Sequence, residues 1–188
     1  MRNIFEVAQE VQEFIIRKKY KFCFIGGLAI QRWGEPRGTN DVDLTVLTGF
    51  GGEEKYIDAF LAQYSGRLPD VREVAISARV ILLKTNDNIG IDISLAGMPF
   101  EEEAVSRASN FEFLPGIYLK TCSAEDLVVY KTFAGRDKDW GDLSGIIYRK
   151  HDLDWHYIET QLLPLLDLKE EPESWSKLMK LKSRCIKS

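Results

Sequence analysis

Residues 24–46 decide the fold and read FIGGLAIQRWGEPRGTNDVDLTV. An apolar strand ends at the glycine pair Gly26 and Gly27, and a short segment compatible with a helix follows. The chain then alternates strictly between polar and apolar residues, so Asp41 and Asp43 project from the same face of a strand. The first chemical feature of the sequence is therefore a pair of carboxylates on a strand shortly after a glycine turn.

A later strand carries a third carboxylate in the same setting. Residues 89–95 also alternate, and Asp92 lies between two isoleucines. If the two strands are neighbours, Asp41, Asp43 and Asp92 converge on one surface of the sheet. Such carboxylates repel one another, and Mg²⁺ with its preference for oxygen ligands relieves the repulsion. Two such ions about 3.5–4 Å apart serve phosphoryl displacement, and a glycine turn before a helix can bind phosphate.

Hydrophobic spacing predicts the remaining elements. The predicted helices are at residues 3–18, 28–33, 53–64, 123–134, 138–149, 154–166 and 173–185. The predicted strands are at residues 22–25, 41–47, 71–76, 79–84 and 89–95, with mostly helix after them. We therefore expect an α+β core over residues 1–118 and a helical C-terminal part over residues 119–188 that packs on the core.

Composition excludes several classes of protein. The 188 residues are 45% hydrophobic and 29% charged, which is ordinary for a globular protein and not for a disordered chain or a coiled coil. The net charge of −4 argues against binding nucleic acid over the whole chain, although basic clusters at residues 17–21 and 177–187 leave an RNA acceptor open. The three cysteines form no C-x-x-C pair, so we expect neither a disulfide framework nor a zinc site.

Location in the cell follows from what the sequence does not contain. No apolar run approaches the roughly 20 residues that span a membrane, and the first residues reach an acid before any apolar run. The sequence therefore predicts a cytoplasmic protein with no signal peptide and no membrane partner.

Two motifs carry a resemblance to a known family. Residues 24–46 resemble the signature of the nucleotidyltransferase superfamily with its polymerase β-like minimal fold: a hydrophobic residue, Gly-Gly, a gap and Asp-hydrophobic-Asp. The Ile-Asp-Ile around Asp92 is similar to the third carboxylate of that family. Residues 123–143, SAEDLVVYKTFAGRDKDWGDL, resemble the helical motif of the AbiEii-type abortive-infection toxin branch, and the lead-in at residues 37–40 is similar to the form common in small bacterial nucleotidyltransferases. The resemblance implies a short mixed sheet flanked by helices.

The resemblance also implies an activity, the metal-dependent transfer of a nucleoside monophosphate from an NTP to a hydroxyl acceptor. It assigns phosphate binding to Gly26 and Gly27, and the lead-in that holds Arg37 and Thr39 is similar to the nucleotide-binding R-x-T-x-D-x-D form. The implied ligands of two Mg²⁺ ions, with Mn²⁺ as an alternative, are Asp41, Asp43 and Asp92.

The implied catalytic residues extend into the helical part. Asp92 is also the implied general base, and Lys131 is implied to contact the triphosphate as a point charge. Asp139 or Asp142 is implied to orient Lys131 or the acceptor, and the sequence does not distinguish between them. The residues themselves allow plainer interpretations: Lys131 extends from an apolar helix towards water, and Lys138 forms an i, i+4 ion pair with Asp142.

The acceptor stays open at this point. A tRNA end, a protein hydroxyl and a small molecule are all compatible with the same metal centre, and the resemblance suggests the toxin of a toxin–antitoxin or phage-defence system with a cognate antitoxin. One alternative is a catalytically silent module of the same fold that binds a nucleotide or a partner. Another is a D-x-D glycosyltransferase with Mn²⁺ and a sugar nucleotide, which leaves Gly26, Gly27 and Asp92 without roles.

Overall fold

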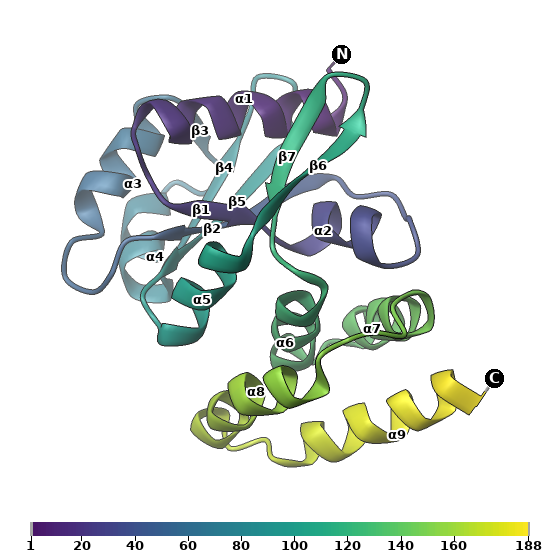
Figure 1. Ribbon diagram of the computed structural model, residues 1–188. Coiled ribbons are helices and arrows are strands. Elements are labelled where there is room, and N and C mark those ends of the chain that lie inside the picture. The colour runs from purple at the N-terminus through teal and green to yellow at the C-terminus, as the bar shows by residue number, and fades with distance from the viewer. Residues whose placement is uncertain (1, 188) are drawn as a thin grey trace. The chain divides into compact units, whose positions relative to one another are not determined.

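The chain forms two compact units in the computed structural model, which describes residues 2–187 (Figure 1). The sheet unit consists of Met1–Leu28 and Gly38–Cys122, and the helical unit consists of Ala29–Arg37 and Ser123–Ser188. Helix α2, Gly26–Trp33, begins in the sheet unit and continues in the helical unit. The glycine turn of the sequence motif therefore belongs to one unit, and most of the helix that follows it belongs to the other.

A mixed sheet of seven strands forms the centre of the sheet unit within the described residues. The strands are β1 (Phe22–Phe24), β2 (Asp41–Leu47), β3 (Ser65–Gly66), β4 (Val80–Lys84), β5 (Gly90–Ala96), β6 (Ser109–Leu114) and β7 (Ile117–Thr121). Their order across the sheet is β3-β4-β5-β2-β1-β7-β6. Strand β2 pairs antiparallel with β1 and parallel with β5, which places the two predicted carboxylate strands next to each other.

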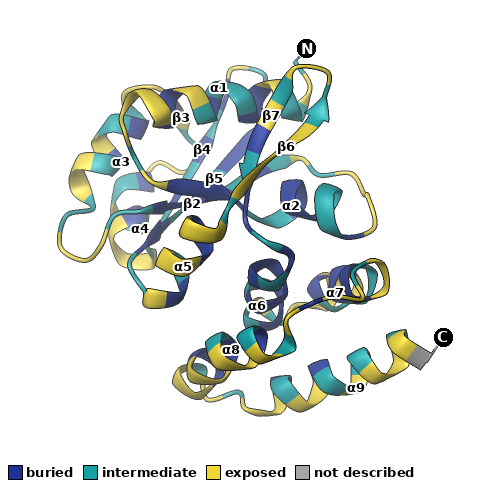
Figure 2. Ribbon diagram, viewed as in Figure 1, coloured by how far each residue is buried: buried dark blue, intermediate teal, exposed yellow. Residues whose placement is uncertain are grey.

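Four helices lie wholly in the sheet unit of the described chain: α1 (Ile4–Arg17), α3 (Glu54–Leu61), α4 (Val71–Ala78) and α5 (Pro99–Arg107). Helix α1 begins where Asn3 and Glu6 form a capping box, in which each side chain accepts a hydrogen bond from the backbone of the other. Its apolar stripe is buried, and the ring of Phe14 lies 5.2 Å from that of Phe60, measured between centroids. Figure 2 shows the buried residues concentrated along the strands and the inner helix faces.

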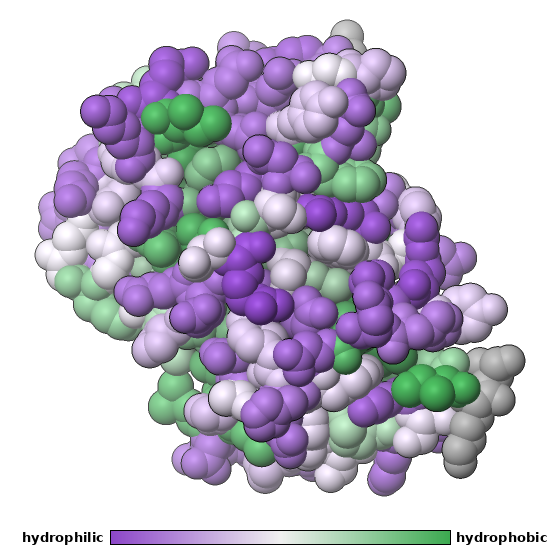
Figure 3. All heavy atoms as spheres, viewed as in Figure 1, coloured by the Kyte–Doolittle hydropathy of each residue, from purple (hydrophilic) through white to green (hydrophobic). Residues whose placement is uncertain are grey.

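The helical unit contains α6 (Ala124–Ala134), α7 (Asp137–Arg149), α8 (Trp155–Lys169) and α9 (Glu173–Lys187). Ser123 caps α6, and Gly135 ends it in the left-handed conformation with φ +67°, which glycine adopts without strain. The segment before β2 is tied to α7, because Arg149 donates a hydrogen bond to the carbonyl of Gly34. Hydrophilic side chains dominate the face in Figure 3, and no described helix has the length and hydropathy of a membrane span.

Two predictions about secondary structure are wrong. Residues 71–76 form part of helix α4 and not a strand, because Val71 and Ala75 share its buried face at an i, i+4 spacing. Residues 99–121 contain the hairpin of β6 and β7 after helix α5, where the sequence predicted mostly helix. The expectation of a mixed sheet flanked by helices and followed by a helical part is confirmed.

Candidate active site

Three aspartates lie together on the sheet unit. The parallel pairing of β2 with β5 places Asp43 directly opposite Asp92, and Asp41 lies two residues before Asp43 on the same face. Val42 and Leu44, which alternate with these aspartates along β2, are fully buried on the opposite face of the strand. Because neighbouring strands are about 4.8 Å apart, the pairing and the alternation place all three carboxylates on the same polar face.

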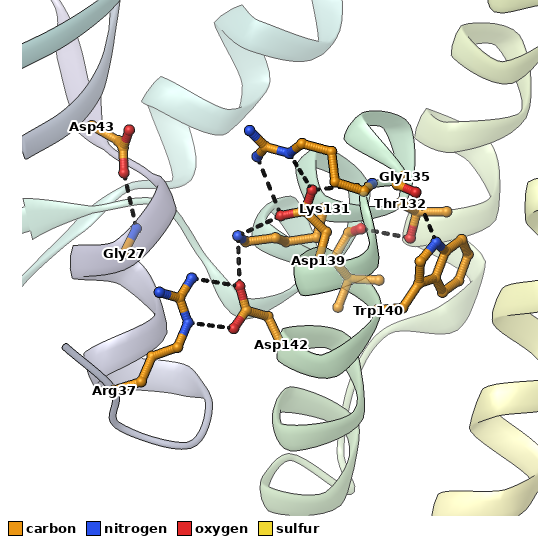
Figure 4. Close-up of polar contacts among 11 residues, drawn as sticks. Gly27, Arg37, Asp43, Lys131, Thr132, Gly135, Asp139, Trp140 and Asp142 are labelled. Carbon is orange, nitrogen blue, oxygen red and sulfur yellow. Dashed lines mark hydrogen bonds and ion pairs between the residues drawn. The ribbon is translucent and has the colours of Figure 1, made fainter. Parts of the chain in front are cut away.

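The glycine turn lies against one of these carboxylates. The backbone N–H of Gly27 donates a hydrogen bond of 3.1 Å to Oδ2 of Asp43 (Figure 4). A Cβ on Gly26, whose φ is +54°, would lie 2.2 Å from the same oxygen, and a Cβ on Gly27 would lie 2.4 Å from Oγ1 of Thr39. Both positions therefore require glycine, and the first turn of α2 presents its backbone to the carboxylates at closer range than any other residue would permit.

An arginine contacts two of the three aspartates. Arg67 contacts Oδ1 of Asp92 through its Nη2 atom and lies 3.5 Å from Oδ1 of Asp41 through Nη1. No group of three His, Cys, Asp or Glu side chains in residues 2–187 is close enough to hold a metal ion. Carboxylates are the ligand type that Mg²⁺ prefers, so the residue types of Asp41, Asp43 and Asp92 match the predicted group, while their side chains are not gathered around one point.

A second charged cluster lies inside the helical unit. The ammonium of Lys131 on α6 donates hydrogen bonds of 2.8 Å to Oδ1 of Asp139 and 2.7 Å to Oδ2 of Asp142, both on α7 (Figure 4). The side chains of Lys131 and the two aspartates are at most 6% exposed. Lys131 therefore does not extend into water, and both aspartates that the sequence left as alternatives accept hydrogen bonds from it.

Two arginines complete the charge balance of this cluster. Arg37 binds Asp142 with both arms of its guanidinium, at 2.7 Å from Nε and 2.9 Å from Nη2. Arg136, at the start of α7, contacts Oδ2 of Asp139 at 2.6 Å. Asp142 is thus held by Lys131 and Arg37, and the structure gives no ion pair between Lys138 and Asp142 among the contacts described for residues 2–187.

The buried carboxylates of this cluster have lowered pKa values. Burial alone would raise the pKa of Asp139, but hydrogen bonds from Arg136 and Lys131 outweigh burial and lower it below its ordinary value. The pKa of Asp142 is lowered in the same way, since Arg37 and Lys131 together outweigh the effect of burial. Both groups are therefore carboxylates at neutral pH.

These lowered pKa values predict acid instability. A carboxyl with a lower pKa in the folded state stabilises the fold above its unfolded pKa, and this contribution is lost as the pH falls through the lowered folded value. We expect the free energy of unfolding in urea to fall as the pH drops below about 4, and to fall less in Asp142→Asn, which has one titrating group fewer. Equal pH dependence in the two proteins would contradict this assignment.

The structure thus brings the predicted residues into two clusters, one in each unit. Thr39 supports the first, since its hydroxyl donates to the carbonyl of Asp41 at 3.1 Å and its side chain borders Gly27. Sequence reasoning missed Arg67, which lies in a turn between β3 and α4 without any pattern of its own. It assigned no role to Arg136, although this residue lies in the helical motif three residues before Asp139.

Comparisons with known proteins agree with this geometry. The chain resembles an antigenic nucleotidyltransferase-like protein from Paracoccidioides brasiliensis, with 15% identity, a TM-score of 0.52 and coverage of 93% of this chain and 91% of that one. It resembles the antibiotic-resistance factor ANT(2'')-Ia with 16% identity, a TM-score of 0.50 and coverage of 96% and 89%. At such identities these likenesses establish a nucleotidyltransferase fold.

The sequence comparison is more specific. None of the curated proteins matches the chain. The family described as "Nucleotidyl transferase AbiEii toxin, Type IV TA system" matches residues 16–155, which contain the glycine turn, the three aspartates of the sheet unit and the whole lysine cluster. The chain therefore belongs to the AbiEii family of nucleotidyltransferases.

Proposed function

We propose that the protein transfers a nucleoside monophosphate from an NTP to a hydroxyl group in a reaction that needs a divalent metal, and that it acts as the toxin of a toxin–antitoxin or phage-defence pair. The observation that carries this proposal is the pairing of Asp43 with Asp92 beside the N–H of Gly27. It brings acidic residues of the kind that hold a metal to the first turn of a helix, where backbone N–H groups can bind phosphate.

Each candidate site residue of the sheet unit has a role in this proposal. The N–H groups at Gly26 and Gly27 bind the β- and γ-phosphates, and Asp41, Asp43 and Asp92 hold Mg²⁺, with Mn²⁺ as an alternative. Bound there, the metal neutralises charge on the phosphates and on the attacking and leaving oxygens. Thr39 keeps the turn in place through its contact with Gly27.

The reaction forms one bond and breaks another. The acceptor oxygen attacks the α-phosphorus, the bond from that phosphorus to the bridging oxygen breaks, and pyrophosphate leaves with the electron pair. Asp92 accepts the proton of the acceptor hydroxyl as general base. Catalysis of this kind is mostly positioning and charge neutralisation, so a small cluster of carboxylates is sufficient.

The lysine cluster supplies the complementary charge. An ammonium has three donors, and two of those of Lys131 go to Asp139 and Asp142. This arrangement supports a role for the two aspartates in aiming the ammonium, and Lys131 keeps the contact with the triphosphate that the family motif implies. Arg37 is assigned to the nucleotide as well, with Asp142 fixing its guanidinium plane.

Radiolabel transfer tests the proposal and identifies the acceptor. The purified protein is incubated with Mg²⁺, a total cell extract and each α-labelled NTP in turn, and the products are separated into RNA, protein and small molecules. Relative to extract alone, we expect the added protein to increase α-label in one acceptor fraction and to leave γ-label in the acceptors unchanged, because the γ-phosphate leaves in pyrophosphate. EDTA should abolish the increase. Tight binding of Mg²⁺ and an NTP in calorimetry without label in any fraction would instead indicate a silent binding module.

A further inference from the structure

An arginine side chain from a neighbouring turn lies between carboxylates of the candidate metal centre. Arg67 follows β3, and its backbone N–H donates to the carbonyl of Leu82 on β4 at 2.9 Å. Leu82 is the direct partner of Asp92 across the pairing of β4 with β5. The order of the strands therefore fixes the backbone of Arg67 beside Asp92, and the side chain reaches both Asp92 and Asp41.

The chain provides room for this contact at Gly90. This residue begins β5 and lies opposite Asp41 in the sheet. A Cβ at Gly90 would lie 2.0 Å from Oδ1 of Asp41 and 3.1 Å from Nη1 of Arg67. A side chain at this position would separate the guanidinium from the carboxylate, so glycine here is what allows the two to meet.

The contact between Arg67 and the two aspartates leaves one donor of the guanidinium unpaired, which favours its replacement by another cation. The two Nη atoms of Arg67 reach the carboxylates, but its Nε atom is buried without a hydrogen-bond partner. An unpaired buried donor disfavours the arrangement that buries it. The side chains of Arg67 and Asp92 are 30% and 31% exposed, so the guanidinium can move while the backbone stays paired.

We propose that Arg67 is a built-in competitor of the divalent cation. Its single positive charge offsets part of the charge of Asp41 and Asp92 in the metal-free protein, and it leaves Asp92 when a metal ion binds there. The inference rests on the proposed function, because it takes these aspartates as metal ligands. Metal can bind only those molecules in which the arginine has left the carboxylates, so the apparent affinity for metal is the intrinsic affinity multiplied by the fraction of such molecules. When metal is scarce, the arginine limits the repulsion between the carboxylates.

Titration of the nucleotide-free protein with Mn²⁺ tests this inference without any transfer reaction. We expect Arg67→Met to bind Mn²⁺ about tenfold more tightly than the wild type. A change of this size lies within the usual range of coupling between two binding events that compete for one site. We also expect its melting temperature to be lower without metal and to rise more on adding metal. Calorimetry and the electron paramagnetic resonance of free Mn²⁺ measure the affinity independently.

The matched control is Arg72→Met, which removes the same charge from the same unit. Arg72 pairs with Asp58 and Glu54 and touches none of the three aspartates of the site. A general change in net charge would move both variants alike, whereas competition tightens binding only in Arg67→Met. If that protein does not fold, Arg67→Gln keeps a polar side chain of smaller size and carries the same expectation.

The outcomes separate this inference from the proposed function. Equal Mn²⁺ affinity in the wild type and in both arginine variants would overturn the competition while leaving the metal centre intact. If the wild type and the variant Asp41→Asn/Asp43→Asn bind Mn²⁺ equally, the assignment of the ligands fails, and the proposed function fails with it. Tighter binding in Arg67→Met that is lost on adding the two asparagines supports both.

Discussion

Replacing Asp41 and Asp43 together by asparagine is expected to abolish nucleotide transfer and leave the protein folded. The change removes two negative charges that we assign to metal binding, and metal binding contributes several kcal/mol of charge stabilisation in the transition state. A loss of about 4 kcal/mol corresponds to roughly a thousandfold in rate. Label transfer from the α-labelled NTP measures the loss.

The fold should survive because both side chains lie at the surface of the sheet. Asp41 is 45% exposed, and an asparagine at position 43 keeps an oxygen that can accept from the N–H of Gly27. Asp58→Asn is the matched control, since Asp58 is an exposed partner of Arg72 on α3. Circular dichroism should give the same spectrum for all three proteins. A double variant with the transfer rate of the wild type would refute the assignment of the metal ligands.

Lys131→Met has the largest expected effect on stability. The ammonium is buried between Asp139 and Asp142, and its removal leaves two buried carboxylates with one cation fewer. Breaking a buried ion pair from one side costs about 3–5 kcal/mol. We expect the lower end of that range, about 3 kcal/mol, because Arg136 and Arg37 still contact the two carboxylates. Urea unfolding monitored at 222 nm measures the change.

Two further variants show that the effect belongs to the ion pair. Lys138→Met removes an exposed lysine from the same region and should alter stability by no more than about 0.5 kcal/mol. Adding Asp142→Asn to Lys131→Met should restore part of the loss, because one of the unpaired charges is then gone. Equal stability of the two lysine variants would show that the buried cluster does not support the fold.

The sequence predicted those elements whose burial pattern agrees with their local preference. Strand β2 has the predicted bounds because polar and apolar residues alternate and the apolar ones are fully buried at Val42 and Leu44. Helix α4 was mistaken for a strand because its β-branched residues favour strands, whereas its burial follows Val71 and Ala75. The period of the buried positions decided the structure there, and the residue types did not.

The hairpin of β6 and β7 was missed for a different reason. The residues at positions 109–112 are exposed on both faces, so this strand shows no buried alternation. The turn itself carried a signal, since Pro115 is followed by Gly116 with φ +81°, a combination typical of a tight turn between strands. Pairing with β7 and the stacking of Phe113 on Phe5, 5.3 Å between ring centroids, hold the strand.

The sequence predicted only those features of the candidate site that follow from the alternation of residues along one strand. Alternation placed Asp41 and Asp43 on one face, but their proximity to Asp92 depends on β2 pairing with β5, which lies more than forty positions later in the chain. Arg67 could not be found, because its contacts arise from the order of the strands alone. The choice between Asp139 and Asp142 had no answer in the sequence, since both lie on one face of α7 and both bind Lys131.

The helical unit is built from two segments that are far apart in the sequence, Ala29–Arg37 and Ser123–Ser188. A newly made chain can complete this unit only after the second segment has been synthesised. Arg37 and Asp142 are 105 positions apart, so at a synthesis rate of about 5–20 residues per second Arg37 leaves the ribosome roughly 5–20 s before its partner. Lys131 likewise emerges before both of its carboxylates on α7. The strands of the sheet unit are complete at Thr121. A growing chain can therefore form its sheet early, but the lysine cluster is assembled only once α7 has been translated, so a prematurely terminated product lacks it.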